Sequence, residues 1–288
     1  MTAIIFGAAG QDGFYLTELL QEQQIEVIGV SRSGNFNRTD IADFIQVNEL
    51  IKKYQPAYIF HLAANSTASH EAQFENHSTI STGTLNILES VKNSSPGTKV
   101  FISGSALQFK NEQLPIKESD AFEARDAYSV SRIQSVYAAR YFRSLGIKTY
   151  VGYFFHHDSP RRTERHMAKK IAEACKRYAN GSKEKLMIGD ITAVKEWTFA
   201  GDAMRAVWTL VQQEEIFEAN IGTGIGHSIE DWLNACAAMA GINWHEFVEI
   251  DHSYRSAIRT ITAAPTVIFS LGWKPATSFD ELARMMMN

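Results

Sequence analysis

The sequence has few cysteines, no long block of one charge and no long apolar run. Cys175 and Cys236 are too few and too scattered for a disulfide framework or a metal site, and free thiols fit a reducing compartment. The net charge is −4, and no basic block indicates a nucleic-acid partner. No apolar run approaches the roughly 20 residues of a membrane span, and no basic region precedes the first apolar run, as a secretory signal requires. We therefore expect a cytoplasmic protein with neither a membrane nor a nucleic-acid partner.

Short β-rich apolar runs alternate with stretches of helical periodicity in the first half of the chain. Such alternation predicts an α/β fold built on a Rossmann-type, doubly wound parallel sheet, because strands covered on both faces are apolar throughout. The expected strands are 2–6, 26–31, 57–64, 100–106 and 148–155, and the expected helices are 14–23, 45–54, 72–93 and 126–145.

The pattern changes after residue 156, where a basic helix at 163–179 is followed by shorter β-rich runs. We predict a dinucleotide-binding domain at 1–156 and a smaller C-terminal α/β substrate lobe at 157–288. Within the lobe we expect helices around 228–240 and 278–287. The helix near 201–213 and the strand 218–222 are expected to return to the sheet, so that about 198–224 belongs with the first domain.

A glycine-rich turn, "GAAGQDG", follows the first strand directly and precedes the first helix. Gly7, Gly10 and Gly13 permit a tight turn and a close approach of backbone N–H groups to a pyrophosphate. The N-terminus of the helix adds partial positive charge. Three glycines in this strand–turn–helix setting predict dinucleotide binding, whereas a plain turn has little need for all three.

The end of the second strand predicts which dinucleotide is bound. An acidic residue there would hold the free 2′-hydroxyl of NAD, but the sequence has Ser31 and Arg32. Arg32 can hold a 2′-phosphate through charge-assisted hydrogen bonds, which favours NADP over NAD. The alternative is a solvated loop arginine.

The stretch "DAYSVSR" at 126–132 places Tyr128 four residues before Arg132. On a helix the two side chains share one face, one turn apart. A phenol beside a fixed positive charge is suited to acid–base chemistry, and an ordinary surface pair is the alternative.

These features occur in order with others that complete a family pattern. "GAAGQDGFYLTELL", "IFHLAA", a serine-bearing strand at 103–105, Tyr128, "FFHHDSPRR" at 154–162 and "GWKP" at 272–275 together resemble the extended short-chain dehydrogenase/reductase family. Within that family the "GQDG" turn and the "SPRR" run are most similar to the GDP-mannose 4,6-dehydratases. The resemblance covers nearly the whole chain.

The resemblance implies NADP across the N-terminal sheet and a GDP-linked sugar held by the C-terminal lobe. It also implies a cycle in which a tyrosinate and a serine act at the sugar C4 hydroxyl, a carboxylate removes the C5 proton, and water leaves from C6. The implied catalytic residues are Ser105, Tyr128 and Arg132. The implied cofactor-binding residues are Gly7, Gly10, Gln11, Asp12, Gly13, Ser31, Arg32, Asp40, Ile41, Ala63, Ala64, Tyr128 and Arg132. The implied substrate-binding residues are Ser66, His157, Arg161, Arg162, Lys169, Lys195 and Arg255.

Several positions depart from the family pattern. Arg132 stands where the family has Lys, and a planar guanidinium is not equivalent to an ammonium. The family's Glu position falls on Leu107, or on Ala106 after a slip of one residue, and neither side chain can accept a proton. Whether Glu112 or Glu196 takes that role is open at this point. His156 replaces an Asn, and we expect no metal at His156 and His157 because adjacent side chains on an extended segment point in opposite directions.

Three functions therefore remain open. The first is an NADP-dependent dehydratase like those of the resembled branch. The second is a 4-keto-sugar reductase or epimerase, which needs Tyr128 and Ser105 but no base at C5. The third is a non-catalytic homologue that binds a nucleotide sugar. The segment between the second strand and Asp40 is shorter than in related dehydratases, where part of it contributes to tetramer contacts, so we expect a homodimer formed by helix pairing.

Overall fold

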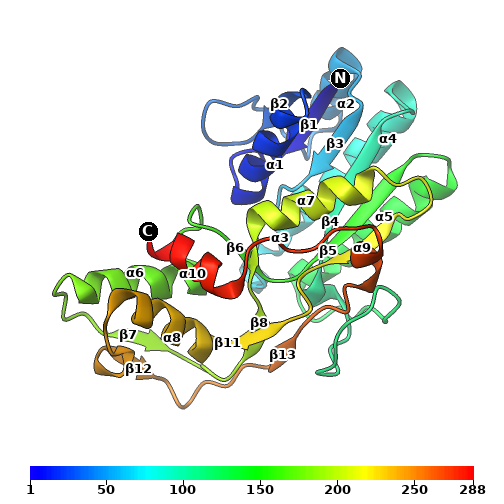
Figure 1. Cartoon of the computed structure of the whole chain (residues 1–288). Coiled ribbons are helices and arrows are strands. Elements are labelled where there is room, and N and C mark those ends of the chain that lie inside the picture. Colours follow the sequence, from blue (N-terminus) through cyan, green and yellow to red (C-terminus); the bar gives the residue numbers. More distant parts are fainter.

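A six-stranded parallel sheet forms the centre of the computed structural model, which describes residues 1–288 (Figure 1). The strand order is β10-β5-β4-β3-β1-β2, and each neighbouring pair is parallel. The predicted doubly wound α/β fold is confirmed. The strands are β1 Thr2–Phe6, β2 Glu26–Val30, β3 Tyr58–His61, β4 Lys99–Ser105, β5 Thr149–Phe154 and β10 Glu218–Ile221.

Helices cover both faces of this sheet, which explains why its strands carry apolar side chains on both faces. One face carries α1 Gln11–Glu22 and α7 Ala200–Val211, and the other carries α2 Phe44–Tyr54, α4 Gly83–Ser94 and α5 Ala127–Ser144. Along β1, Ala3 and Ile5 join the core beneath α1 and α7, whereas Ile4 and Phe6 join the opposite core. Because successive side chains of a β-strand point to opposite faces, one apolar run contributes to both cores.

The long helix expected at 72–93 is one continuous helical segment with a wide turn in its middle. A short turn at His70–Ala72 leads into α3 Gln73–Asn76, then a π-helical turn at His77–Thr82, and then α4. The Ile80 carbonyl accepts hydrogen bonds from Thr84 Oγ1 (2.7 Å) and Ser135 Oγ (3.1 Å). Side-chain hydroxyls therefore supply hydrogen bonds to a backbone carbonyl in the widened turn.

β2 is the edge strand of the sheet, and the loop between β2 and α2 adds no further strand to it. Only Asn37 pairs with β2, through Ser31 N–H to the Asn37 carbonyl and Asn37 N–H to the Gly29 carbonyl, both 3.0 Å. The Phe36 ring lies where a Cβ on Gly29 would be. The short segment 31–42 consequently remains next to the carboxyl end of β1.

A smaller lobe with its own core lies below the sheet in Figure 1. Its core includes the stacked rings of Trp197 and Trp232, whose centroids are 4.4 Å apart. Its helices are α6 Met167–Ala179, α8 Ile229–Ala240 and α10 Phe279–Met287. Its strands are β7 Leu186–Ile188, β8 Val194–Glu196, β11 Gly226–Ser228, β12 Val248–Ile250 and β13 Thr260–Ile261.

Two segments connect the lobe with the sheet domain. β6 His157–Asp158 pairs with β9 Thr198–Phe199, and the chain then continues into α7 and β10. Near the C-terminus, α9 Thr266–Ser270 and Trp273 pack on the face of the sheet that carries α7, and Trp273 Nε1 donates to the Asp202 carbonyl (3.0 Å). The sequence pattern did not predict this second return of the chain. No helix in the structure is both long enough and apolar enough to cross a membrane.

Candidate active site

The glycine turn is packed too closely for side chains. Gly7 has φ = +95°, and a Cβ there would lie 2.7 Å from the Ala63 amide nitrogen. A Cβ on Gly13 would lie 2.6 Å from Ala8 Cα. Helix α1 begins directly after Gly10, and no side chain caps its N-terminus. Its first N–H groups and its positive end are therefore free to face an anion.

A cavity of about 450 Å³ lies over the carboxyl ends of β1, β2 and β3. Ligands of open α/β sheets bind in this position, and the glycine cradle with its free helix end fits a dinucleotide. The predicted cofactor residues that line this first cavity are Gly7, Gly10, Ser31, Arg32, Asp40, Ile41, Ala63 and Ala64. Thr39, Ser78 and Thr79 also line it, and the sequence pattern did not single them out.

A polar strap crosses the edge of the first cavity. Arg32 Nη2 lies 2.6 Å from Glu75 Oε1 in α3, and Asn65 Nδ2 donates to the other Glu75 oxygen (2.8 Å). The hydrogen bond from Arg32 lowers the pKa of Glu75. Arg32 thus already has an anionic partner, although its side chain is 77% exposed.

A second cavity of about 350 Å³ adjoins the first, because Leu62 and Ala64 line both. It brings together predicted residues from the two domains. Those that line it are Asp12, Ser66, Ser105, Tyr128, Arg132, His157, Arg162 and Lys195. Ala106 and Leu107 line it as well, so the position of the missing carboxylate faces this space.

Tyr128 lies in the first turn of α5, which Asp126 caps through its side chain. Its ring lies under the Arg132 guanidinium, 5.1 Å from centroid to Cζ, so the two side chains share one helix face as predicted. Arg132 is only 4% exposed. Its Nη1 donates to the Ser103 hydroxyl (2.7 Å) and to the Ser103 carbonyl. The guanidinium therefore fastens α5 to β4, which an ammonium on a shorter side chain would do differently.

Ser105 ends β4 and begins the short turn Ala106–Gln108. Its Oγ accepts from the Leu107 amide (3.2 Å), and its own amide donates to Gln108 Oε1 (2.9 Å). This capping arrangement fixes the serine at the floor of the second cavity, with its hydroxyl hydrogen available to a ligand.

Neither carboxylate considered as a substitute for the missing base lines the second cavity. Glu112 is exposed and pairs with Lys110. Glu196 is buried and accepts from the amides of Thr223, Gly224 and Ala263. Burial raises the pKa of Glu196 to about 7. Its role in this arrangement is to join β8 to the loop after β10 and to the segment after β13.

The side chains of Gln11 and Asp12 do not line the first cavity but contact residues of the smaller lobe. Asp12 Oδ1 lies 3.0 Å from His157 Nε2, and Ser159 Oγ donates to Gln11 Oε1 (2.8 Å). Burial lowers the pKa of His157, but the Asp12 carboxylate outweighs it and the net direction is upward. For Asp12, burial raises the pKa, but the charge and hydrogen bond of His157, together with the charge of Arg162 and a hydrogen bond from Gln11, lower it overall. Two residues of the "GQDG" turn thus connect the domains.

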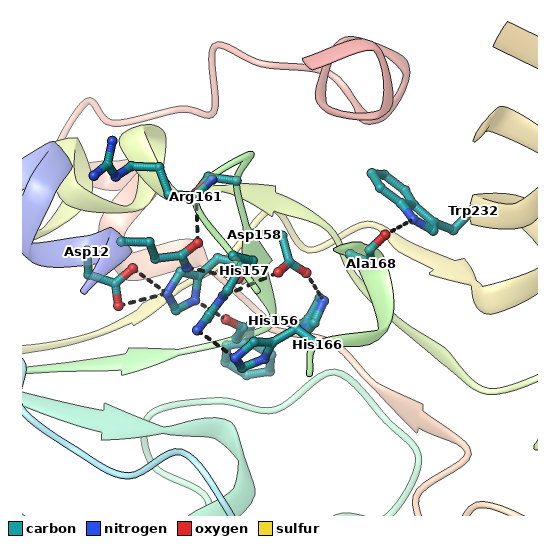
Figure 2. A network of polar contacts seen from close by, with 12 residues as sticks. Asp12, His156, His157, Asp158, Arg161, His166, Ala168 and Trp232 are labelled. Carbon is teal, nitrogen blue, oxygen red and sulfur yellow. Dashed lines mark hydrogen bonds and ion pairs between the residues drawn. The ribbon is translucent and has the colours of Figure 1, made fainter. Parts of the chain in front are cut away.

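The two adjacent histidines point to different partners, as the extended backbone predicts. His157 faces Asp12, whereas His156 Nε2 lies 2.5 Å from Asp158 Oδ2 (Figure 2). No group of three or more His, Cys, Asp or Glu side chains is arranged to hold a metal ion.

Three predicted substrate residues lie outside both cavities. Arg161 stacks on the Phe14 ring of α1 (3.6 Å from Cζ to centroid), and its side chain turns away from the His156–Asp158 pair in Figure 2. Lys169 pairs with Glu173 one turn later in α6 (2.8 Å). Arg255 lies 4.0 Å from Asp190 with 62% of its side chain exposed. Each cation has a local partner that the family motif does not reveal.

The second cavity also contains residues that the predictions did not assign to the site. Ser103, His156 and His166 line it. His156 and its partner Asp158 both belong to the "FFHHDSPRR" run, so the signal was present in the sequence. Their pairing could not be read from it, because it depends on how the chain turns after β5.

Comparison with known proteins gives the family. The family model for GDP-mannose 4,6 dehydratase matches residues 4–286. GDP-mannose 4,6 dehydratase 2 of Arabidopsis thaliana is 31% identical over 99% of this chain and 86% of its own, and the human GDP-mannose 4,6 dehydratase is 26% identical over 99% and 90%.

Solved structures agree in fold. RMD from Pseudomonas aeruginosa, complexed with NADPH, has a TM-score of 0.88 at 19% identity over 99% of this chain and 97% of its own. The dTDP-glucose 4,6-dehydratase of Bacillus anthracis, in complex with NAD, has a TM-score of 0.87 at 17% identity over 99% and 95%. The chain belongs to the GDP-mannose 4,6-dehydratase family, and it is therefore an enzyme of the nucleotide-sugar dehydratase type or of its epimerase and oxidoreductase relatives.

Proposed function

We propose that this protein is an NADP-dependent enzyme that oxidises or reduces C4 of a nucleotide-linked sugar. The observation that carries the proposal is the joining of the two cavities, with Ser105 and Tyr128 in the second and the glycine cradle in the first. The cofactor, when bound, would supply or accept the hydride. Tyr128 would transfer the proton of the C4 hydroxyl, and Ser105 would donate a hydrogen bond to the C4 oxygen.

The choice of NADP rests on the end of β2. Ser31 and Arg32 line the first cavity, and no acidic side chain stands at this strand end to hold a free 2′-hydroxyl. Arg32 would exchange its contact with Glu75 for the 2′-phosphate. The related structures carry NADPH in one case and NAD in the other.

Charge supports a nucleotide sugar as the ligand, because Arg162 and Lys195 line the second cavity from the lobe and would face a diphosphate. The family makes GDP the proposed nucleotide. The complete dehydratase reaction needs a base for the C5 proton, and Leu107 supplies none.

We also propose that the protein is a cytoplasmic homodimer. Val130, Tyr137, Tyr141 and Leu145 form one exposed apolar stripe along α5, where a second copy would pack. The two cysteines are free and buried, as is usual for proteins of a reducing compartment.

The test uses the purified protein with two pairs of reagents. NADPH with a GDP-linked 4-keto sugar reports reduction at C4, and NADP with GDP-mannose reports oxidation with or without loss of water. We expect NADPH absorbance to fall with the first pair, and mass spectrometry to show a product heavier by two hydrogens. Cofactor binding without hydride transfer in either pair contradicts the proposal and leaves a binding function.

A further inference from the structure

The second cavity contains an imidazole backed by a buried carboxylate that the C4 chemistry does not use. His156 lines the cavity, whereas Asp158 lies behind it and is fully buried. Figure 2 shows the Asp158 carboxylate facing the His156 ring. The feature matters because the same cavity holds Leu107 where the family has a carboxylate that serves as base.

Contacts with Asp158, Trp197 and Thr198 fix the orientation of His156. Nε2 lies 2.5 Å from Asp158 Oδ2, and the other Asp158 oxygen lies 3.3 Å from Arg162 Nε. The imidazole meets the Trp197 ring edge-on at 5.2 Å between centroids, and the His156 carbonyl accepts from the Thr198 amide (3.2 Å). Because the carboxylate attracts the proton to Nε2, the lone pair is left on Nδ1.

The free edge of the ring is accessible from the cavity. The His156 side chain is 25% exposed, and Nδ1 is not among the buried atoms that lack a partner. Ser105 stands opposite Phe154 in the register of β4 and β5, so His156 follows two residues past the level of the serine. Both side chains line the space that Tyr128 and Leu107 also line.

We propose that His156, oriented by Asp158, is the acid–base residue that moves the proton on the sugar carbon beside the C4 carbonyl, in place of the carboxylate that Leu107 lacks. This inference rests on the proposed function, because it requires a 4-keto sugar in the second cavity. His156 is the catalytic residue, and Asp158 is a positioning residue that acts through it.

The proton transfer balances without any further reagent. Nδ1 takes the C5 proton, the electrons of the C–H bond form the C4–C5 double bond, and the carbonyl oxygen becomes an enolate oxygen that Ser105 and Tyr128 can stabilise by hydrogen bonds. Return of a proton from the imidazolium to C5 restores the ketone. Where C6 bears a hydroxyl, the enolate can instead expel it, and the imidazolium proton converts it to water.

The charged surroundings keep the imidazole available as a base. Burial lowers the pKa of His156 to about 4, and Lys195 contributes to this shift while Asp158 opposes it. The ring is therefore neutral near pH 7. Burial raises the pKa of Asp158, but the charge and hydrogen bond of His156 and the charges of Arg162 and Lys195 together lower it to about 2, so its carboxylate is ionised over the same range.

The experiment separates proton transfer at C5 from hydride transfer at C4. The intact protein is incubated with a GDP-linked 4-keto-6-deoxy sugar in deuterium oxide without added cofactor, and NMR follows deuterium incorporation at C5. We expect His156→Asn to slow exchange by roughly 10²-fold or more, a much larger loss than that of NADPH-dependent reduction at C4. Asp158→Asn is expected to slow exchange and to shift its pH profile. The matched control is His245→Asn, an exposed histidine outside both cavities.

The other possible results distinguish failure of this inference from failure of the proposed function. Hydride transfer without C5 exchange in the unaltered protein overturns this inference and leaves the proposed function intact. Exchange at an unchanged rate in His156→Asn overturns it too, as does an equal loss of exchange and hydride transfer, which indicates general damage to the cavity. Absence of hydride transfer contradicts the proposed function, whereas exchange that depends on His156 supports the inference even then.

Discussion

At the residue scale, Tyr128 offers the most direct test of the C4 chemistry. Its hydroxyl makes no hydrogen bond to another protein group, so Tyr128→Phe removes the proposed proton carrier without breaking a contact. We expect hydride transfer to fall by roughly 10²-fold or more, with the melting temperature unchanged. Tyr137→Phe on the exposed side of the same helix is the matched control. Reduction of the 4-keto sugar by Tyr128→Phe at close to the original rate contradicts the role.

A second prediction at the residue scale concerns Lys195, because burial of its charged ammonium group lowers the stability of the folded protein. Burial lowers its pKa to about 8 from an ordinary value of 10.5. The folded protein therefore binds fewer protons than the unfolded chain between these two pH values, so the penalty is complete below about pH 8 and disappears towards pH 10.5. A diphosphate in the second cavity would offset this penalty.

We expect Lys195→Met to raise the free energy of unfolding of the ligand-free protein by about 1–3 kcal/mol near pH 7. Denaturant titrations at several pH values would measure this, and the gain should shrink as the pH rises from about 8 to about 10.5. The same variant should lose most of the thermal stabilisation that GDP-mannose gives. Lys183→Met, at an exposed position, is the control. Lower stability in Lys195→Met at pH 7 contradicts the argument.

At the element scale, the strap joins the ends of β2 and β3 to α3, and under the proposed function it would compete with the cofactor. Glu75 holds Arg32 and repels a phosphate that approaches it. An exposed ion pair contributes at most about 1 kcal/mol, so Glu75→Gln should strengthen NADP binding by roughly threefold to fivefold. Binding of NAD should change less than about twofold.

Isothermal titration with each cofactor measures both affinities. Arg32→Ala is expected to weaken NADP binding and to leave NAD binding nearly unchanged. Glu71→Gln, at an exposed carboxylate in the short turn that precedes α3, is the matched control because its partner is Ser69. An equal gain for NAD and NADP in Glu75→Gln indicates that Arg32 does not read the 2′-phosphate.

The elements of the sheet domain could be predicted because each carries a local signal. Apolar runs and helical spacing predicted the central sheet and its helices, and the glycines predicted the turn that precedes α1. The π-helical turn at His77–Thr82 could not be predicted, since it depends on hydroxyls of Thr84 and of Ser135 in a different helix. The return of α9 to the sheet depends on the contact of Trp273 with Asp202, 71 residues earlier.

At the scale of the whole molecule, the candidate site is assembled from distant segments, and this limits what a sequence can reveal. Tyr128, Ser105 and Lys195 were predicted from motif positions, and the fold brings them to one cavity. The contact of Asp12 with His157 spans 145 residues, and no local pattern records it. The reverse holds for Arg161 and Lys169. Their motif positions predicted a place in the site, but each side chain contacts a neighbour outside the cavity.

The exposed stripe of α5 gives the last prediction, which concerns assembly. Tyr137 and Tyr141 are 57% and 60% exposed, one turn apart, and neighbouring α4 exposes Leu85. A two-fold axis beside these helices would let each copy bury the stripe of the other, since a symmetric dimer contacts itself with the same surface. Sedimentation should therefore give twice the chain mass of 32.3 kDa.

Tyr137→Glu combined with Tyr141→Glu should give the mass of a single chain with an unchanged circular dichroism spectrum, because both rings lie outside the cores. Leu114→Glu, at an exposed apolar residue outside the helices, should remain dimeric. A single-chain mass for the unaltered protein at micromolar concentration contradicts the dimer. A dimer that survives both glutamates places the interface on another face, because burying two carboxylates against their symmetry copies costs more than an apolar helix contact returns.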